Sequence, residues 1–330
     1  MSASQPTRSQ PTRSQHTLLR PTAPWIVLPR THPDLDGVGC AVAYAELLRW
    51  RGQAALPFIP GTPDAEARFI LEHPPLAELA TEEQAKTANA FVLVDASDTP
   101  GLAPFVDPQQ VVEVVDHRRH HKAHAVFPNA RVHIEPVGAA ATLIEERFVA
   151  HKRTPSPEAA RLLYGAIHSN TQHLRGSVTT ARDRASARRL LAGGTIPTNL
   201  LEGQFEARRN EILDNLETAI GREDKTFSLP DGPYHFTQLE LSGATSLYQE
   251  RAADLLKYLS RLHPRTILNL VDVTTGGSLL VVPDPKFRAW IRRRTGLEFQ
   301  EEIAYSGQAL LRKQVVAMLE GLVNTNKTRK

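Results

Sequence analysis

The sequence predicts an α/β protein, in which an N-terminal domain built on a doubly wound, mostly parallel sheet precedes a smaller C-terminal α/β domain. From residue 25 to residue 148, short apolar runs alternate with segments of helical character, as in parallel sheets that helices cover on both faces. A glycine-rich break at residues 193–198 then interrupts the chain. Beyond this break, charged helical segments surround a second set of strand-like runs, which indicates a separate unit.

A polar repeat precedes the expected fold. The chain reads Ser4-Gln5-Pro6-Thr7-Arg8, and residues 9–13 repeat this order. Because a polar segment with prolines cannot bury a core, we expect residues 1–20 to form a disordered tail. The rest of the chain is then expected to divide into a first domain at residues 21–192, a linker at residues 193–198 and a second domain at residues 199–330.

In the first domain, apolar runs define the strands and helical spacing of apolar residues defines the helices. Val38, Val42 and Leu48 show this spacing, and Pro157 directly after Ser156 marks another helix start. The expected strands are residues 25–29, 55–60, 91–94, 111–115 and 132–137. The expected helices are residues 38–51, 64–73, 139–148 and 156–191.

In the second domain, a turn at Thr274-Thr275-Gly276-Gly277 joins two strand-like runs into an expected hairpin. The expected strands are residues 225–229, 234–241, 266–273 and 278–282. The expected helices are residues 199–222, 246–263, 286–295 and 308–323.

Composition narrows the class of protein. Lys and Arg number 39 against 36 Asp and Glu, so the net charge is only +3 and does not argue for a nucleic-acid partner. The single Cys40 fits a reducing compartment. No apolar stretch reaches the roughly 18 residues of a membrane span. We therefore expect a cytoplasmic protein without a membrane partner, and we leave open whether it forms a homodimer.

Asp34 and Asp36 lie two residues apart, between the first expected strand and the first expected helix. In an open α/β sheet, ligands bind at the carboxyl ends of the strands, where these side chains would lie. Carboxylate oxygens suit Mg²⁺ or Mn²⁺. Alternatively, an aspartate in this place caps the following helix. The pair alone does not decide between a metal site and a helix cap.

Two more apolar runs end in similar residues. One run ends at Asp95, with Asp98 close behind, and the next ends at Asp116 and His117. If these strands are parallel neighbours, their carboxyl ends converge on one edge of the sheet. Oxygen ligands with one imidazole suit Mn²⁺ or Mg²⁺, and a shared carboxylate can bridge two ions about 3.5–4 Å apart. Three such strand ends in series favour a metal site.

The order of these motifs resembles that of the DHH phosphoesterases, and most closely the branch of family II inorganic pyrophosphatases, exopolyphosphatases and Prune proteins. The motifs are Asp34-Leu35-Asp36, Asp95 with Asp98-Thr99-Pro100, Asp116-His117, and residues 135–143. Lys225 before Phe227, and residues 311–316, resemble the phosphate-binding segments of that branch's C-terminal domain. The resemblance covers roughly residues 24 to 325.

The resemblance implies a metal-dependent phosphohydrolase with its active site in the cleft between the two domains. It would cleave the phosphoanhydride bonds of pyrophosphate or polyphosphate with a metal-activated water molecule, using Mn²⁺ or Mg²⁺. The catalytic residues carried over from the motifs are Asp34, Asp36, Asp95 and His117. The implied metal ligands are these four residues and Asn170. The implied substrate-binding residues are Arg30, Arg118, Lys225 and Arg312.

The sequence departs from the family's pattern at several motif positions. The family has a histidine four residues before its first aspartate, where this chain has Arg30. A second histidine is replaced by Arg118, and the aspartate of the fourth motif by Asn170. The family's Ser-Arg-Lys run becomes Leu310-Leu311-Arg312. A guanidinium cannot ligate a metal, and an amide oxygen is a weaker ligand than a carboxylate.

These departures predict weaker metal binding than in a typical pyrophosphatase. The position formed by Asp36, Asp95 and His117 should fill first, and one bound ion rather than two is an open alternative. An alternative hypothesis is that the protein is a catalytically degenerate member of the family, which binds phosphoanions or a partner without turnover. A third hypothesis is an oligonucleotide or cyclic dinucleotide phosphodiesterase. The glycine-rich motif of such enzymes is matched only superficially here, by Gly276-Gly277-Ser278.

Overall fold

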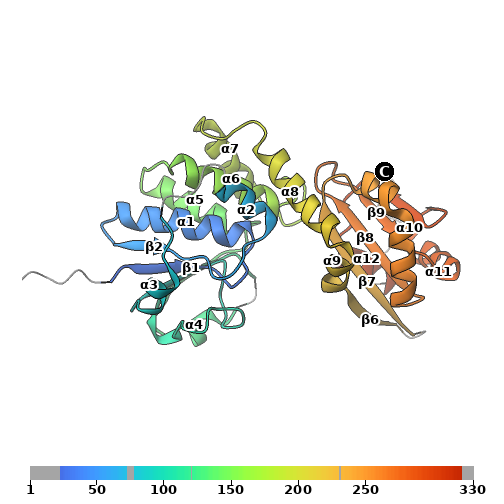
Figure 1. The fold of residues 1–330 in the computed structure, drawn as a ribbon, viewed down its shortest axis with the longest axis horizontal. Coiled ribbons are helices and arrows are strands. Elements are labelled where there is room, and N and C mark those ends of the chain that lie inside the picture. The colour runs from blue at the N-terminus through green and yellow to red at the C-terminus, as the bar shows by residue number, and fades with distance from the viewer. Residues whose placement is uncertain (1–22, 73–77, 120, 230–231, 322–330) are drawn as a thin grey trace, which may run out of the picture.

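The computed structural model describes residues 23–72, 78–119, 121–229 and 232–321, and it confirms the predicted fold class (Figure 1). Two sheets form the two halves of the molecule. The first has five strands in the order β2-β1-β3-β4-β5, and the second has six in the order β10-β11-β9-β8-β7-β6. The tail expected at residues 1–20 lies outside the described residues.

Neighbouring strands of the first sheet all run parallel. Successive residues of a strand face opposite sides of the sheet, so Val27 and Val92 pack in one hydrophobic cluster and Ile26 and Leu93 in another. The strands are β1 (Trp25–Leu28), β2 (Ala55–Pro57), β3 (Phe91–Val94), β4 (Val111–Asp116) and β5 (Arg131–Ile134). One face is covered by α1 (Leu35–Trp50), α2 (Ala65–Leu71), α5 (Ala140–Ala150), α6 (Pro157–Asn170) and α7 (Ala181–Ala192). The other is covered by α3 (Glu82–Lys86) and α4 (Ala123–Val126).

The single helix expected at residues 156–191 is wrong, because α6 ends at Asn170 and α7 begins at Ala181. Gln172, His173 and Leu174 all adopt left-handed backbone conformations, with φ of 49°, 57° and 62°. Such conformations cannot continue a right-handed helix. The break leaves Asn170 at the end of a helix.

The helix expected at residues 199–222 is also divided. The loop expected before it is present, and α8 (Leu200–Asp214) then packs against α2 of the first half, where Arg68 and Glu211 form an ion pair of 2.7 Å. Asn215 leaves helical geometry, with φ −132° and ψ 41°. The following α9 (Leu216–Glu223) therefore turns onto β7 of the second sheet.

The second sheet pairs β7 with β8 in parallel, and its other neighbours are antiparallel. The expected hairpin through residues 274–277 is confirmed, whereas the hairpin of the last two strands was not predicted. The expected helix at residues 308–323 begins only at Arg312, because the backbone of Leu310 is held on the sheet by hydrogen bonds with Ser278 and Asn269. The strands are β6 (Lys225–Leu229), β7 (Gly232–Leu241), β8 (Thr266–Asp272), β9 (Ser278–Val281), β10 (Phe299–Gln300) and β11 (Ile303–Ser306). The helices after α9 are α10 (Ala244–Leu262), α11 (Pro285–Thr295) and α12 (Arg312–Leu319).

No helix among the described residues is both long and apolar enough to cross a lipid bilayer.

Candidate metal centre

Asp36, Asp95 and His117 come together at the carboxyl edge of the first sheet. Asp36 lies in the first turn of α1, Asp95 follows β3 and His117 follows β4. One ligand atom from each lies within 4.8 Å of the other two. Asp95 has a left-handed backbone, with φ of 50°, which is uncommon for a residue with a side chain and recurs at functional sites. The convergence expected from the strand ends is therefore present for these three residues.

Hydrogen bonds fix the Asp36 carboxylate in place. It is fully buried and accepts from the backbone amides of Ala140 and Ala141, each at 2.8 Å, at the start of α5. Such free amides at a helix N-terminus favour a negative charge. The side-chain amide of Asn170 also donates to Asp36, at 2.6 Å. Asn170 therefore lies beside the group and is bonded directly to one of its members.

The imidazole of His117 is oriented for coordination. Its Nδ1 lies 3.0 Å from the carbonyl oxygen of Val137, to which a protonated Nδ1 donates. This bond leaves Nε2 facing the carboxylates, 3.5 Å from Asp95 and 3.9 Å from Asp36. A backbone bond of this kind is how proteins commonly fix a metal-binding histidine.

The charges of the group fit a cation. Burial raises the pKa of Asp36, and the neighbouring Asp95 raises it further; burial likewise raises the pKa of Asp95. Burial opposes protonation of His117, but the adjacent Asp95 and Asp36 outweigh it and raise its pKa. Oδ1 of Asp95 is buried without a hydrogen-bond partner among the described residues. A divalent cation would neutralise this repulsion and satisfy that oxygen, so the residues fit Mn²⁺ or Mg²⁺.

Asp34, by contrast, lies outside this three-residue group and caps a helix. Its carboxylate accepts from the amide of Gly37 at 3.0 Å, at the start of α1. The two alternatives therefore apply to different residues: Asp34 caps α1, and Asp36 belongs to the three-residue group. Asp34 also lines the cleft described below.

Two predicted substrate-binding arginines lie around the group, and each is paired with an aspartate. Arg30 binds Asp98. Arg118 donates to Asp116 at 2.8 Å and lies 3.8 Å from Asp95. Of the two, only Arg118 reaches a residue of the three-residue group.

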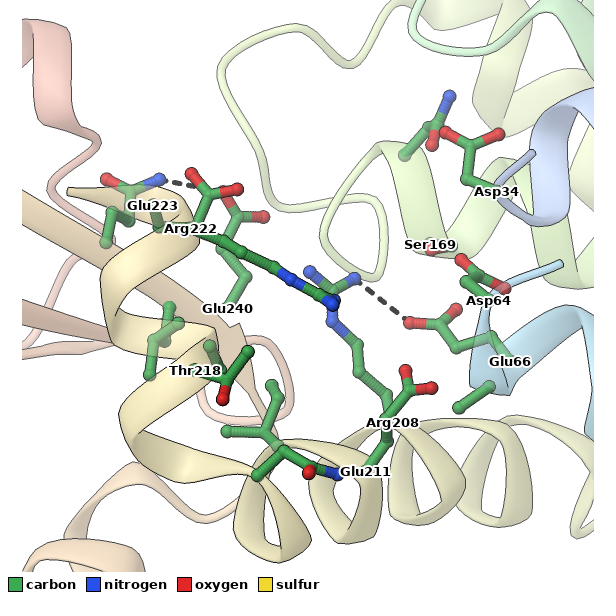
Figure 2. Close-up of a pocket in the computed structure, with 17 residues that line it drawn as sticks. Asp34, Asp64, Glu66, Ser169, Arg208, Glu211, Thr218, Arg222, Glu223 and Glu240 are labelled. Atoms are coloured by element: carbon green, nitrogen blue, oxygen red, sulfur yellow. Dashed lines mark hydrogen bonds and ion pairs between the residues drawn. The ribbon is translucent and has the colours of Figure 1, made fainter. Parts of the chain in front are cut away.

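A cleft of about 670 Å³ separates the metal edge from the second sheet (Figure 2). Asp34, Ser169 and Asn170 line it from the first half. Thr218 and Arg222 on α9, and Gln238 and Glu240 on β7, line it from the other side.

The two remaining predicted substrate residues, Lys225 and Arg312, line an adjoining cavity. Arg312 there donates to the carboxylate of Glu223 at 3.1 Å and to its carbonyl oxygen at 2.9 Å. Glu223 and Gln238 line both cavities, so the two spaces adjoin.

Sequence reasoning missed three residues that shape this region: Asp64, Asp183 and Arg222. Asp183 is fully buried and accepts bonds from Gly138 and Thr142. A capping box with Thr180 three residues earlier was the signal that could have revealed Asp183. Asp64 caps α2. No local sequence pattern indicated that Arg222 would line the cleft.

Asp64 gives a test of the charge balance in the cleft. It accepts from the amide of Ala67 at 2.8 Å, and burial, reinforced by the nearby Glu66, raises its pKa to about 7. A raised folded pKa means that the unfolded chain ionises first as pH rises, so stability falls between about pH 4 and pH 7. An asparagine in place of Asp64 would keep the capping oxygen without the charge.

We therefore expect Asp64→Asn to be more stable than the wild type at pH 8. One pKa unit corresponds to about 1.4 kcal/mol, and the α2 dipole offsets part of the cost, so the gain should be about 1–3 kcal/mol. The gain should shrink toward zero near pH 4. Urea unfolding at pH 5 and pH 8 measures this, and a gain equal at both values would contradict the assignment.

The parallel sheet, the acidic and imidazole group at its carboxyl edge, and the second sheet across a polar cleft define the class: a two-sheet α/β protein whose cleft borders a group that fits a divalent metal ion. No protein-family model matches the chain. A Bacillus cereus (strain B4264) protein described as a probable manganese-dependent inorganic pyrophosphatase is 30% identical over 266 residues, covering 77% of this chain and 84% of the relative. A Clostridium acetobutylicum protein of the same description is 24% identical over 294 residues, covering 86% and 93%.

The chain therefore belongs to the family of manganese-dependent inorganic pyrophosphatases, which confirms the pyrophosphatase branch expected from the motifs. A solved structure from Methanococcus jannaschii, provisionally assigned to the family II inorganic pyrophosphatases, shares the fold. Its TM-score is 0.57 at 21% identity, with 90% of this chain and 98% of that chain covered.

Proposed function

We propose that the chain hydrolyses pyrophosphate, with polyphosphate as the second substrate, at a Mn²⁺ site held by Asp36, Asp95 and His117. The observation that carries this proposal is the buried Oδ1 of Asp95 within the three-residue group, which accepts no hydrogen bond from the residues that the structure describes and lies 3.5 Å from Nε2 of His117. The relatives described as manganese-dependent inorganic pyrophosphatases support both the substrate and the metal. A divalent ion bound there supplies Lewis-acid stabilisation and activates a water molecule.

The chain's own residues bind and orient the substrate in this proposal. Arg118, 3.8 Å from Asp95, holds a phosphate oxygen beside the metal group. Lys225 on β6 and Arg312 on α12 contribute positive charge from the second half of the molecule, from a cavity that shares Glu223 and Gln238 with the cleft. Asp34 orders the loop before α1 by capping that helix. The break at Asn215, between α8 on the first half and α9 on the second sheet, connects the two halves of the molecule.

We further propose a single bound ion rather than two. Asn170 donates to Asp36 at 2.6 Å, so its amide supports one carboxylate of the group without adding a negative ligand. Arg30 is bound to Asp98, and a guanidinium offers no lone pair to a metal. Asn170 and Arg30 thus each replace a metal ligand of the family's motifs with a side chain that ligates a metal weakly or not at all.

Asn170→Asp tests this arrangement. An added carboxylate beside Asp36 should strengthen Mn²⁺ binding by on the order of tenfold, since hard cations prefer charged oxygen ligands. Without metal, the variant should be less stable by about 1–3 kcal/mol, because a donor is replaced by a like charge. Calorimetric Mn²⁺ titration and metal-free unfolding measure the two effects.

Asn210→Asp is the matched control, since Asn210 is exposed on α8. It should change neither Mn²⁺ binding nor metal-free stability. Unchanged or weaker Mn²⁺ binding in Asn170→Asp would contradict the prediction that a carboxylate at this position contributes to metal binding.

A second function is a phosphoanion-binding protein without turnover. It is favoured by Arg30 and Arg118, which occupy motif positions where the family has histidines. A guanidinium binds phosphate oxygens but cannot ligate a metal. Release of orthophosphate from pyrophosphate and from polyphosphate, with and without Mn²⁺, separates the two functions. Manganese-dependent release supports the hydrolase, and phosphate binding without release from either substrate supports the second function.

A further inference from the structure

The cleft of Figure 2 is lined by charged side chains from both halves of the molecule, and nearly all of them have partners. Asp34 and Asp64 accept from backbone amides as helix caps. The other bonds are Glu66 with Gln204 and Arg208, Glu211 with Arg68, Glu223 with Arg312, and Glu240 with Gln172 and Gln238. The negative charges of the cleft are therefore largely engaged within the protein.

Arg222, near the end of α9, is the exception. It lines the same cleft but makes no hydrogen bond or ion pair within the part of the chain that the structure describes. Figure 2 shows its side chain extending from α9 into the cleft. Arg208, which lines the same cleft, is already paired with Glu66 at 3.1 Å. Among the described residues of the cleft, Arg222 is therefore the cation whose charge is left to attract an anion.

The position of Arg222 sets it apart from the two cations expected to bind substrate. Arg222 shares its cleft with Asp34 and Asn170 at the metal edge, whereas Lys225 and Arg312 line the adjoining cavity. Arg312 is also held by Glu223. Arg222 is thus the unengaged cation that faces the metal edge from the second half, among the described residues that line the cleft.

We infer that Arg222 is a substrate-positioning residue, which binds the phosphate group of pyrophosphate that lies farther from Asp36, Asp95 and His117. The inference rests on the proposed function for the identity of the substrate. A guanidinium is suited to this role because its planar donors can bind two phosphate oxygens at once, which a lysine cannot match. Substrate binding would also bring α9 and the metal edge together across the cleft.

The test compares Arg222→Gln and Arg222→Lys with the wild type and with Arg293→Gln, an exposed arginine on α11 away from the cleft. Calorimetry measures the Kd of imidodiphosphate, a pyrophosphate analogue, in the presence of Mn²⁺, and kinetics measure KM and kcat for pyrophosphate. Arg222→Gln should weaken analogue binding and raise KM by on the order of 10- to 100-fold. Its kcat should stay within about threefold of wild type. Arg222→Lys should restore part of the loss, and Arg293→Gln should match the wild type.

The results distinguish this inference from the proposed function. If the wild type hydrolyses pyrophosphate and Arg222→Gln keeps the wild-type Kd and KM, the inference is overturned and the hydrolase proposal stands. If the wild type binds the analogue without hydrolysing pyrophosphate, and Arg222→Gln binds it at least tenfold more weakly, the inference stands and the hydrolase proposal fails. A lower unfolding temperature with an unchanged Kd would show a merely structural role, which overturns the inference.

Discussion

Asp95→Asn should lower manganese-dependent hydrolysis of pyrophosphate by about 10³-fold while leaving the protein folded. Asp95 supplies the buried oxygen that accepts no hydrogen bond among the described residues, in the group with Asp36 and His117. Loss of a charged ligand removes several kcal/mol of charge stabilisation from the reacting phosphate, which corresponds to about a 10³-fold fall in kcat/KM. Steady-state release of orthophosphate with Mn²⁺ measures the fall.

The same substitution separates lost chemistry from lost folding. Burial raises the pKa of Asp95, so its carboxylate is held at a cost that an uncharged amide avoids. Metal-free Asp95→Asn should therefore unfold at the same temperature as the wild type or higher. Added Mn²⁺ should raise the unfolding temperature of the wild type and leave that of the variant unchanged, because a ligand stabilises only a protein that binds it.

Asp107→Asn is the matched control, because Asp107 is exposed and asparagine can keep its capping bond. It should retain both hydrolysis and the Mn²⁺-dependent rise in unfolding temperature. Wild-type turnover in Asp95→Asn, or a Mn²⁺-dependent rise as large as that of the wild type, would contradict the assignment of Asp95.

The strands of the first sheet could be predicted because they are buried on both faces. Phe91–Val94 is apolar without interruption, and a polar residue after such a run indicates the strand end. The carboxyl ends of parallel neighbours share one edge, so the meeting of Asp95 and His117 could be expected from the sequence alone. Burial and strand direction determined that part of the site.

Other parts depend on contacts that no local pattern records. The β10 and β11 strands have only two and four residues and are separated by Glu301 and Glu302, so their sequence resembles a loop until β9 pairs with Ile303–Ser306. Arg222 reaches the cleft only because the chain leaves helical geometry at Asn215. Asp183 bonds with Gly138, which lies 45 residues away in the sequence. Long-range contacts of this kind cannot be predicted from a single sequence.

Asp183→Ala should be among the most destabilising substitutions in the first half. The Asp183 carboxylate accepts from the amide of Gly138 at 3.0 Å, the hydroxyl of Thr142 at 2.6 Å, and the amide and hydroxyl of Thr180 at 2.6 and 2.7 Å. Alanine leaves these donors without an acceptor, and the buried ones, on Gly138 and Thr142, cost about 1–3 kcal/mol each when unpaired. We expect the free energy of unfolding to fall by about 3–5 kcal/mol, as measured by urea denaturation.

The effect should also reach the metal group, because Gly138 lies between two segments that hold its ligands. Val137 accepts the hydrogen bond of His117, and the amides of Ala140 and Ala141 hold Asp36. Asp183→Ala should therefore bind Mn²⁺ about 10- to 100-fold more weakly, as expected when a residue that supports metal ligands is lost. Asp183→Asn keeps one acceptor oxygen and should be intermediate in both measurements. The exposed Asp214→Ala should match the wild type. An unfolding free energy within about 1 kcal/mol of wild type in Asp183→Ala would show that these bonds contribute little, since substitutions at uninvolved sites have effects of that size.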